Sequence, residues 1–414
     1  MHGGFKNGCE MRIKERSLEG VKVIEYASLV AGPYCTKLLA DLGAQVIKIE
    51  RPEIGDEARR RGPFPNDIPH PERSGLFLYV NTNKLGITLA PETSAGKEIF
   101  LALVEWADVL VEDRPPGVMA ELGLSYDVLK LANPRLIMTS ITPFGQTGPY
   151  RDYKAHSLTI SHGAGAGFLT PVDASEEELG PVKGGGLFDR YSNGLSAAAA
   201  TLVALYAREM TGEGQHIDVS EQESSIAYDR VEISMFPTEG FISRRVRPFG
   251  GTVPLPCQDG HALIAIGEER HWKALVELMG NPEWTKDERF KDEESRFKHA
   301  MELHPFMSQW TGAFFKEDLY RKLASAGIPA GVVRSQGELI ERDEQLKARG
   351  FFVDIEHPEA GRLAYPSASY WLSETPWRVE RPAPTLGQHN DEVYCGLLGY
   401  SGDDVVKLKE ARVI

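Results

Sequence analysis

The sequence VKVIEYASLVAGPYCTKLLADLGAQVIKIE, residues 21–50, contains two short apolar runs separated by a small-residue turn and an amphipathic stretch. Fully buried parallel strands read as continuous apolar runs, so this segment predicts a strand, a turn, a helix and a second strand. Similar units follow in ITLAP, a helix over Glu92–Trp106, ADVLVED, and LIMTSITPFG at residues 136–145. This alternation predicts an α/β fold with an open, mostly parallel sheet, covered by helices and binding ligands at the carboxyl ends of its strands.

The chain of 414 residues is longer than a single hydrophobic core usually supports, so two domains are expected. The Ala-rich stretch SAAAATLVALYAREMTG, residues 196–212, predicts a buried helix that ends at a glycine cap, Gly212. Residues 239–251 turn to Arg, Pro and Gly. The predicted division is a large domain over residues 1–224, a smaller α+β domain over 225–335, and a segment, 336–414, that returns to the large domain.

The charge, cysteine content and apolar runs of the chain limit the kinds of binding partner and the cellular compartment that we expect. Sixty acidic residues against 46 basic ones give a net charge of −14, which disfavours binding to nucleic acid or to an anionic membrane surface. The four cysteines form no CxxC pair, and the eleven histidines show no metal-binding spacing, so we expect reduced thiols and no metal. Without an apolar run of membrane-spanning length or a signal-peptide core at the start, a cytoplasmic protein is expected.

Two stretches suit a phosphorylated ligand, although each has a simpler interpretation. The turn SLVAGPYC, residues 28–35, would let a ligand approach backbone amides at a helix start, or would only connect two elements. Lys48, Arg51 and the run Arg59–Arg61 gather cations beyond a strand end, or form a solvated basic loop. The GAGAGF at residues 163–168 lacks the third glycine of a dinucleotide fingerprint, which disfavours an NAD site.

Several long motifs occur in one order along the chain. They are LEGVKVIEYASLVAGPYCTKLLADLGAQVIKIERPEIGDEARR, VNTNKLGITL, ADVLVEDRPPGVMAELGLSYDVL, NPRLIMTSITPFGQTGPY and REMTGEGQHIDVS. Together they closely resemble the family III CoA-transferases, the CaiB/BaiF family, which includes formyl-CoA transferase, carnitine-type CoA-transferases and α-methylacyl-CoA racemase. The resemblance covers nearly the whole chain, with weaker similarity in CQDGHALIAIG, HWKALVELMGNPEW and LGQHNDEV.

The resemblance implies a fold, a dimer and a CoA site. The large domain would be Rossmann-like and built from both chain ends, and ring-like subunits would interlock as a homodimer or as a heterodimer with a homologous subunit. Coenzyme A would serve as substrate and product, without a metal. The residues implied for CoA binding are Val30, Ala31, Arg51, Asn81, Thr82, Asn83, Lys84, Asp113, Arg114, Thr142, Pro143 and Phe144.

The family's mechanism uses an active-site aspartate that attacks the donor thioester and becomes an aspartyl-CoA thioester. That aspartate lies four residues before a glycine, here Gly194, and a count without a gap falls on Arg190. Asp189 lies one position earlier, so either a one-residue insertion restores Asp189 as the nucleophile or the chain has lost it. Arginine stays protonated and cannot attack a thioester.

The two interpretations of Asp189, as the nucleophile or not, imply two different roles for the chain. With Asp189 as nucleophile, it is a transferase moving CoA from a donor such as succinyl-CoA to a carboxylic acid. Without it, the chain is a CoA-binding subunit whose homologous partner carries the aspartate. Benzylsuccinate CoA-transferase of anaerobic toluene degradation is similar to such a two-subunit case, and the chain resembles its E subunit. Benzylsuccinate is therefore a candidate acceptor.

Three further residues are candidates for the substrate site. Arg190 would neutralise a substrate carboxylate or merely pair with a glutamate. Gly250 and Gly251 would offer backbone amides to a developing oxyanion, as would the glycines 184–186. An acyl-CoA racemase is the remaining enzyme alternative; it needs an acid and a base on either side of the α-carbon, and His156 alone does not supply that pair. Composition identifies neither the donor nor the acceptor.

Overall fold

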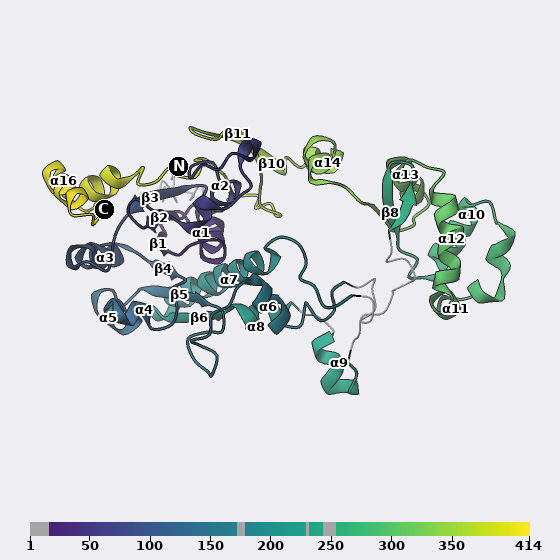
Figure 1. Ribbon diagram of the computed structural model, residues 1–414, viewed down its shortest axis with the longest axis horizontal. Helices are drawn as coiled ribbons and strands as arrows, with labels where there is room; N and C mark the ends of the chain where they lie inside the picture. The colour runs from purple at the N-terminus through teal and green to yellow at the C-terminus, as the bar shows by residue number, and fades with distance from the viewer. Residues whose placement is uncertain (1–15, 172–178, 229–231, 243–253) are drawn as a thin grey trace, which may run out of the picture. The chain divides into compact units, whose positions relative to one another are not determined.

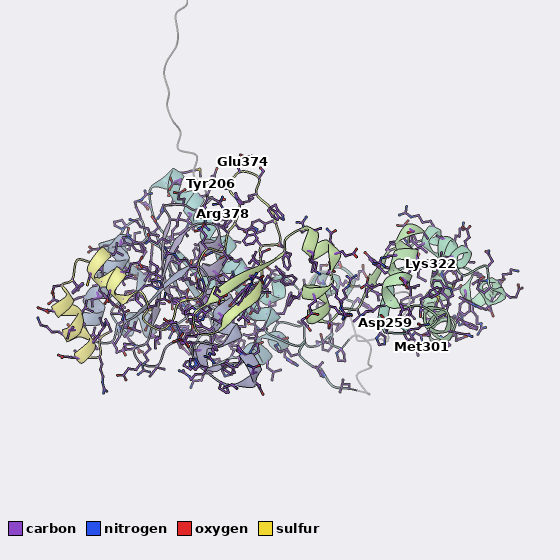
Figure 2. All side chains as sticks on the ribbon, turned by 90° about the horizontal axis from the view of Figure 1, so that it is seen from above. Tyr206, Asp259, Met301, Lys322, Glu374 and Arg378 are labelled. Atoms are coloured by element: carbon purple, nitrogen blue, oxygen red, sulfur yellow. The ribbon has the colours of Figure 1, made fainter. Side chains whose placement is uncertain are left out.

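The computed structural model describes residues 16–171, 179–228, 232–242 and 254–414. The chain divides into two compact units. The first comprises Met1–Ala166, Lys183–Phe241 and Arg349–Ile414, and the second comprises Gly167–Val182 and Ile242–Ala348. The side chains labelled Tyr206, Glu374 and Arg378 in Figure 2 belong to the first unit, and those labelled Asp259, Met301 and Lys322 belong to the second. The domain limits at residues 224 and 335 stay a prediction.

The first unit contains the predicted parallel sheet (Figure 1). All five neighbouring pairs are parallel, in the order β3-β2-β1-β4-β5-β6, which places the change of winding direction between β1 and β4. The mixed α/β architecture with an open parallel sheet is therefore confirmed. Its strands are β1 (Lys22–Tyr26), β2 (Gln45–Glu50), β3 (Lys84–Thr88), β4 (Val109–Glu112), β5 (Ile137–Thr142) and β6 (His216–Ser220).

Two apolar cores cover the two faces of this sheet, because successive strand residues point to opposite sides. Val23 packs with α1 and α7, whereas its neighbour Ile24 packs with α3 and α5. Figure 1 shows these two pairs of helices on either side of the strands. The helices of this unit are α1 (Ala31–Asp41), α2 (Gly75–Val80), α3 (Ser94–Trp106), α4 (Val118–Glu121), α5 (Tyr126–Ala132), α6 (Ser157–Gly163), α7 (Phe188–Thr211), α8 (Glu221–Ala227), α9 (Glu232–Glu239) and α16 (Gly402–Glu410).

Two helix starts differ from the sequence-based expectation. Helix α3 begins at Ser94, because the Thr93 side chain accepts a hydrogen bond from the Gly96 N–H and caps the helix there. Helix α7 begins at Phe188, eight residues before the Ala-rich stretch, and so includes Asp189 and Arg190 in its first turn. Its end at Gly212 is as predicted, with the left-handed φ of 78° that favours glycine.

The second unit has a three-stranded antiparallel sheet in the order β7-β8-β9. Trp272, Leu275, Phe290 and Leu323 contribute to its separate core. The elements are β7 (Leu255–Cys257), β8 (Gly260–Ile264), β9 (Ala330–Val332), α10 (Glu269–Leu278), α11 (Glu293–Lys298), α12 (Ala300–Thr311), α13 (Lys316–Ser325), α14 (Gln336–Glu341) and α15 (Glu344–Ala348). After it, the antiparallel pair β10 (Phe352–His357) and β11 (Gly361–Pro366) belongs to the first unit. None of the helices among the described residues has the length and apolar character needed to cross a membrane.

A buried network of charges links the first three strands of the parallel sheet. The Glu25 carboxylate on β1 lies 2.6 Å from Lys48 Nζ on β2 and 2.7 Å from Lys84 Nζ on β3, and all three side chains are fully buried. Burial alone would raise the pKa of Glu25, but the two lysines together hold that pKa below its ordinary value. The network therefore depends on the glutamate being ionised.

Replacing Glu25 by Gln leaves two buried lysines without their shared counter-charge. We expect the free energy of unfolding to fall by about 3–5 kcal/mol, measured by urea denaturation at pH 7. Glu57→Gln is the matched control, because the Glu57–Arg61 pair is about half exposed and its loss costs at most about 1 kcal/mol. Equal losses in the two variants would contradict a structural role for the network.

Candidate functional site

A cavity of about 820 Å³ opens at the carboxyl ends of β1, β4, β5 and β6. This is the edge where parallel α/β sheets bind ligands, next to the change in strand order. The residues that line it come from the ends of these four strands and the segments that follow them, from the approach to and start of α6, from the start of α7, from Arg61, and from Leu76 of α2. They are Ser28, Leu29, Val30, Ala31, Arg61, Leu76, Asp113, Pro115, Pro116, Ile141, Pro143, Arg151, Asp152, Tyr153, Lys154, Ala155, His156, Ser157, Leu158, Leu187, Arg190 and Glu221.

The wall formed by residues 28–31 is held by two carboxylates, those of Asp56, which is buried, and Asp113, which is partly exposed. The Leu29 N–H donates to Asp56 Oδ1 at 2.9 Å, and the Ser28 N–H donates to Asp113 Oδ2 at 2.8 Å. Leu29 adopts a left-handed φ of 64°, which turns the chain sharply between β1 and α1. Lys48 in turn holds Asp56 at 2.8 Å. The loop is thus held in one shape by groups beneath it, without any ligand.

Asp189 lies in the first turn of α7, beside the cavity. Its Oδ1 accepts a hydrogen bond from Ser157 Oγ at 2.6 Å and lies 3.8 Å from Lys183 Nζ. Its Oδ2 is buried and has no hydrogen-bond partner in the described part of the chain. Asp189 is itself outside the cavity lining, whereas its partner Ser157 is part of it. One oxygen is therefore held by Ser157, and the other is buried without a hydrogen-bond partner among the described residues.

Arg190, the next residue on α7, does line the cavity and forms an ion pair with Glu221. Glu221 is the first residue after β6 and is 2% exposed. Burial raises the pKa of Glu221, and Arg190 offsets that effect only in part. The pair places a cation and its less exposed counter-ion together in the cavity wall.

A second, smaller cavity of about 100 Å³ lies between β4, β5 and β6. Ser140 Oγ and His216 Nε2 are 2.8 Å apart there, and the Glu112 carboxylate accepts the Arg114 N–H at 2.7 Å. Burial raises the pKa of Glu112 to about 7, against the lowering effect of hydrogen bonds from Ser140 and the Arg114 backbone. Glu112 is therefore protonated well above the usual range of a glutamate.

Comparison with known proteins identifies the family. The chain matches CoA-transferase family III over residues 18–390. It is 32% identical to formyl-CoA:oxalate CoA-transferase of Streptomyces avermitilis, covering 96% of this chain and 100% of that protein. It is also 32% identical to succinyl-CoA–D-citramalate CoA-transferase of Chloroflexus aurantiacus, over 96% and 98% of the two chains.

The chain belongs to CoA-transferase family III. A crystal structure of a CaiB/BaiF family protein from Brucella suis agrees in fold, with a TM-score of 0.83, 30% sequence identity, and coverage of 93% of this chain and all of that one. Membership confirms the resemblance on which the sequence-based prediction rested. It makes the chain a CoA-transferase enzyme, with acyl-CoA and carboxylic acids as its classes of substrate.

The structure gathers part of the predicted site in one cavity. Val30, Ala31, Asp113, Pro143 and Arg190 all line it, as expected for residues that follow strand ends. His156, which the sequence analysis considered only as one member of a racemase acid–base pair, lines the same cavity.

Other predicted CoA contacts have internal roles in the described structure. Lys84 Nζ donates to the carbonyl oxygens of Pro33 and Val80 and to Asn81 Oδ1, at 2.7–2.8 Å. Thr82 is buried, and Asn83 bonds to the backbone of residues 378–381. Arg51, Arg114, Thr142 and Phe144 lie outside the lining of the large cavity. Their contact with CoA stays a prediction, and Gly250 and Gly251 lie outside the described residues.

Sequence reasoning missed three side chains at this site: Ser157, Lys183 and Glu221. Glu221 carried a usable signal, because it directly follows the QHIDVS strand and strand ends define the binding edge. Ser157 and Lys183 carried none, since only the fold brings them 2.6 Å and 3.8 Å from Asp189.

Glu112 gives the small cavity a measurable pH dependence. Its folded pKa of about 7 lies above the unfolded value of 4.5, so its contribution to stability is present below pH 4.5 and is lost as the pH rises to about 7. The loss amounts to about 3 kcal/mol. Glu112→Gln should remove it, so urea unfolding at pH 5 and pH 8 should differ less in the variant than in the wild type. Glu121→Gln, an exposed change nearby, should leave the difference intact.

Proposed function

We propose that the chain transfers CoA from succinyl-CoA to a second dicarboxylic acid, with Asp189 as the nucleophile and benzylsuccinate as a candidate acceptor. The observation that carries the proposal is the state of Asp189, with one oxygen held by Ser157 and the other buried and unbonded among the described residues, beside a cavity at the strand ends. The names of the two relatives, which include oxalate, succinyl-CoA and citramalate, support a dicarboxylate.

The proposed reaction begins when Asp189 Oδ2 attacks the acyl carbon of the donor and the C–S bond breaks, releasing CoA thiolate. The thiolate then attacks Asp189 Cγ, which expels the donor acid and leaves an aspartyl-CoA thioester. The acceptor carboxylate attacks the same carbon, and the C–S bond breaks to release CoA thiolate and leave an anhydride of Asp189 and the acceptor. The thiolate then attacks the acceptor's acyl carbon, and the bond from that carbon to the Asp189 oxygen breaks. Acceptor-CoA leaves and the Asp189 carboxylate is restored.

The cavity wall suits this sequence of steps. Residues Val30 and Ala31 at the start of α1, and Asp113 and Pro143 beyond β4 and β5, are the proposed contacts of CoA, together with the other sequence-predicted positions. Arg190 would stabilise the carboxylate of a dicarboxylic acyl group that is not reacting. The hydrogen bond from Ser157 would hold the Asp189 carboxylate in one orientation, as is common for catalytic nucleophiles.

A second role is favoured by one specific observation: Arg190 and not Asp189 lines the cavity. In that case the chain binds CoA beside a homologous subunit that supplies the aspartate. The two roles differ in whether the isolated chain forms a covalent adduct.

The nucleophile is tested by trapping the aspartyl thioester. The purified chain is incubated with succinyl-CoA, treated with hydroxylamine and digested, and the expected product is a hydroxamate on the peptide that contains Asp189. Asp189→Ala should abolish it, while Asp152→Ala, an exposed acid of the cavity lining, should retain it. A wild-type chain that binds CoA yet gives no adduct would contradict Asp189 as nucleophile and support the second role.

A second chain is the proposed partner, and an apolar row on α7 supports it. Leu195, Val203, Tyr206 and Met210 are 48–73% exposed, and their spacing places them on one side of the helix. Tyr206 is labelled in Figure 2. Exposed apolar rows of this kind mark protein interfaces.

Changing this row should weaken association between chains. We expect Val203→Asp to raise the dimer dissociation constant at least tenfold, measured by analytical ultracentrifugation of the isolated chain and of any copurifying homologue. Lys130→Asp, on the exposed side of α5, is the control for an added negative charge. An unchanged dissociation constant for Val203→Asp would place the interface elsewhere.

A further inference from the structure

The Arg190–Glu221 ion pair is unevenly exposed within the cavity wall. The Arg190 side chain is 21% exposed, whereas that of Glu221 is 2% exposed. Both residues line the cavity, and the cation is the more accessible member of the pair. Glu221 Oε2 is buried and finds no hydrogen-bond partner in the ranges that the structure describes.

Glu221 has other carboxylates for neighbours. The negative charges of Asp113 and Asp189 both act to raise its pKa, in the same direction as burial, and Arg190 opposes them. Among the described residues, the remaining titratable groups on α8, on the elements that pack against it and on the cavity wall are Glu223, Tyr191, Tyr206, Arg208, Glu209, His162, His216, Asp218, Arg61, Arg151, Asp152, Tyr153, Lys154 and His156. Arg190 is the cation that directly contacts the buried carboxylate.

We propose that a substrate carboxylate replaces Glu221 at Arg190 and that Glu221 takes up one proton from solvent as the ion pair opens. The inference rests on the proposed function in one respect: the other carboxyl group of the same substrate is the one that faces Asp189. The exchange makes Arg190 the selector for dicarboxylic substrates. Glu221 is a positioning residue that forms the ion pair with Arg190 when no substrate is bound.

Proton uptake follows from burial. A guanidinium can hold a planar carboxylate through two parallel hydrogen bonds, which makes the substrate a better partner than the single contact recorded between Arg190 Nη1 and Glu221 Oε1. Once Arg190 is taken, an ionised Glu221 would be a buried charge without a counter-ion, which is a costly state. A proton on the carboxylate removes that cost. No bond other than the new O–H forms or breaks.

A fixed ion pair would behave differently in two measurable ways. If Glu221 only holds the Arg190 side chain in position, removing the charge of Glu221 should weaken substrate binding or leave it unchanged. Substrate binding should then take up no proton. If Glu221 competes for Arg190, removing its charge should strengthen binding.

Calorimetry of succinate binding to the full chain saturated with CoA tests the exchange. Titrations between pH 7 and 8.5, in two buffers of different ionisation enthalpy, should show about one proton taken up per succinate bound. The wild-type dissociation constant should rise about tenfold per pH unit, as linkage to one proton requires.

Three variants separate the exchange from other effects. At pH 8, Glu221→Gln, which mimics the protonated form, should bind succinate at least tenfold more tightly than the wild type and without pH dependence. Arg190→Gln should lose at least tenfold in affinity and should no longer prefer succinate over its monoamide. Glu223→Gln, an exposed change on the same helix, should behave as the wild type. Retained CoA affinity shows that each variant is folded.

The inference is overturned if wild-type binding takes up no proton, or if Glu221→Gln binds no more tightly than the wild type or shows no binding at all. Succinate binding needs no covalent step, so the result is independent of the adduct experiment. An adduct at Asp189 without proton uptake overturns this inference alone, and proton-linked binding without an adduct overturns the proposed nucleophile alone.

Discussion

The buried carboxylate of Glu25 is the group on which the rest of the first unit depends. It joins Lys48 and Lys84 across three strands and also accepts a hydrogen bond from Thr36 on α1 at 2.5 Å. Lys48 continues the network to Asp56, which holds the backbone of Leu29 in the cavity wall. Buried charges are tolerated only when paired, so each member depends on the next. The shape of the binding edge is therefore set from within the sheet.

The position of the nucleophile is a question of helix geometry. Asp189 and Arg190 are successive residues in the first turn of α7, and successive side chains on an α-helix point about 100° apart. Arg190 lines the large cavity, whereas Asp189 lies outside its lining. Asp189 instead points toward Ser157 and Lys183. Because Asp189 and Arg190 are one residue apart, the cavity wall receives a positive side chain, and the carboxylate of Asp189 is paired with Ser157 and Lys183.

The sheet was predictable because its strands are fully buried and therefore apolar, and because the alternation of strand and helix admits few other arrangements. The position of the large cavity, at the carboxyl ends of the strands, agrees with the same rule. The roles of individual polar residues did not follow. The NTNK segment suggested a ligand contact, but Lys84 and Asn81 bond to the ends of α1 and α2, and no local pattern distinguishes a lysine that binds phosphate from one that holds a backbone carbonyl. The pairing of Arg190 with Glu221 joins residues 31 positions apart, which only the fold determines.

Gly194 joins two walls of the large cavity. A β-carbon at this position would lie 2.5 Å from the carbonyl oxygen of Ala31 and 3.2 Å from the Tyr34 side chain, so α7 can lie this close to α1 only with glycine there. The contact at Gly194 therefore fixes the start of α1 relative to the start of α7. The first turn of α1 carries the proposed CoA contacts, and the first turn of α7 carries Asp189 and Arg190. Their separation is settled during folding, before any acyl-CoA arrives. The conformational entropy of fixing these two turns relative to each other is then lost at that stage and not on substrate binding, which lowers the cost of placing a bound ligand beside the first turn of α7.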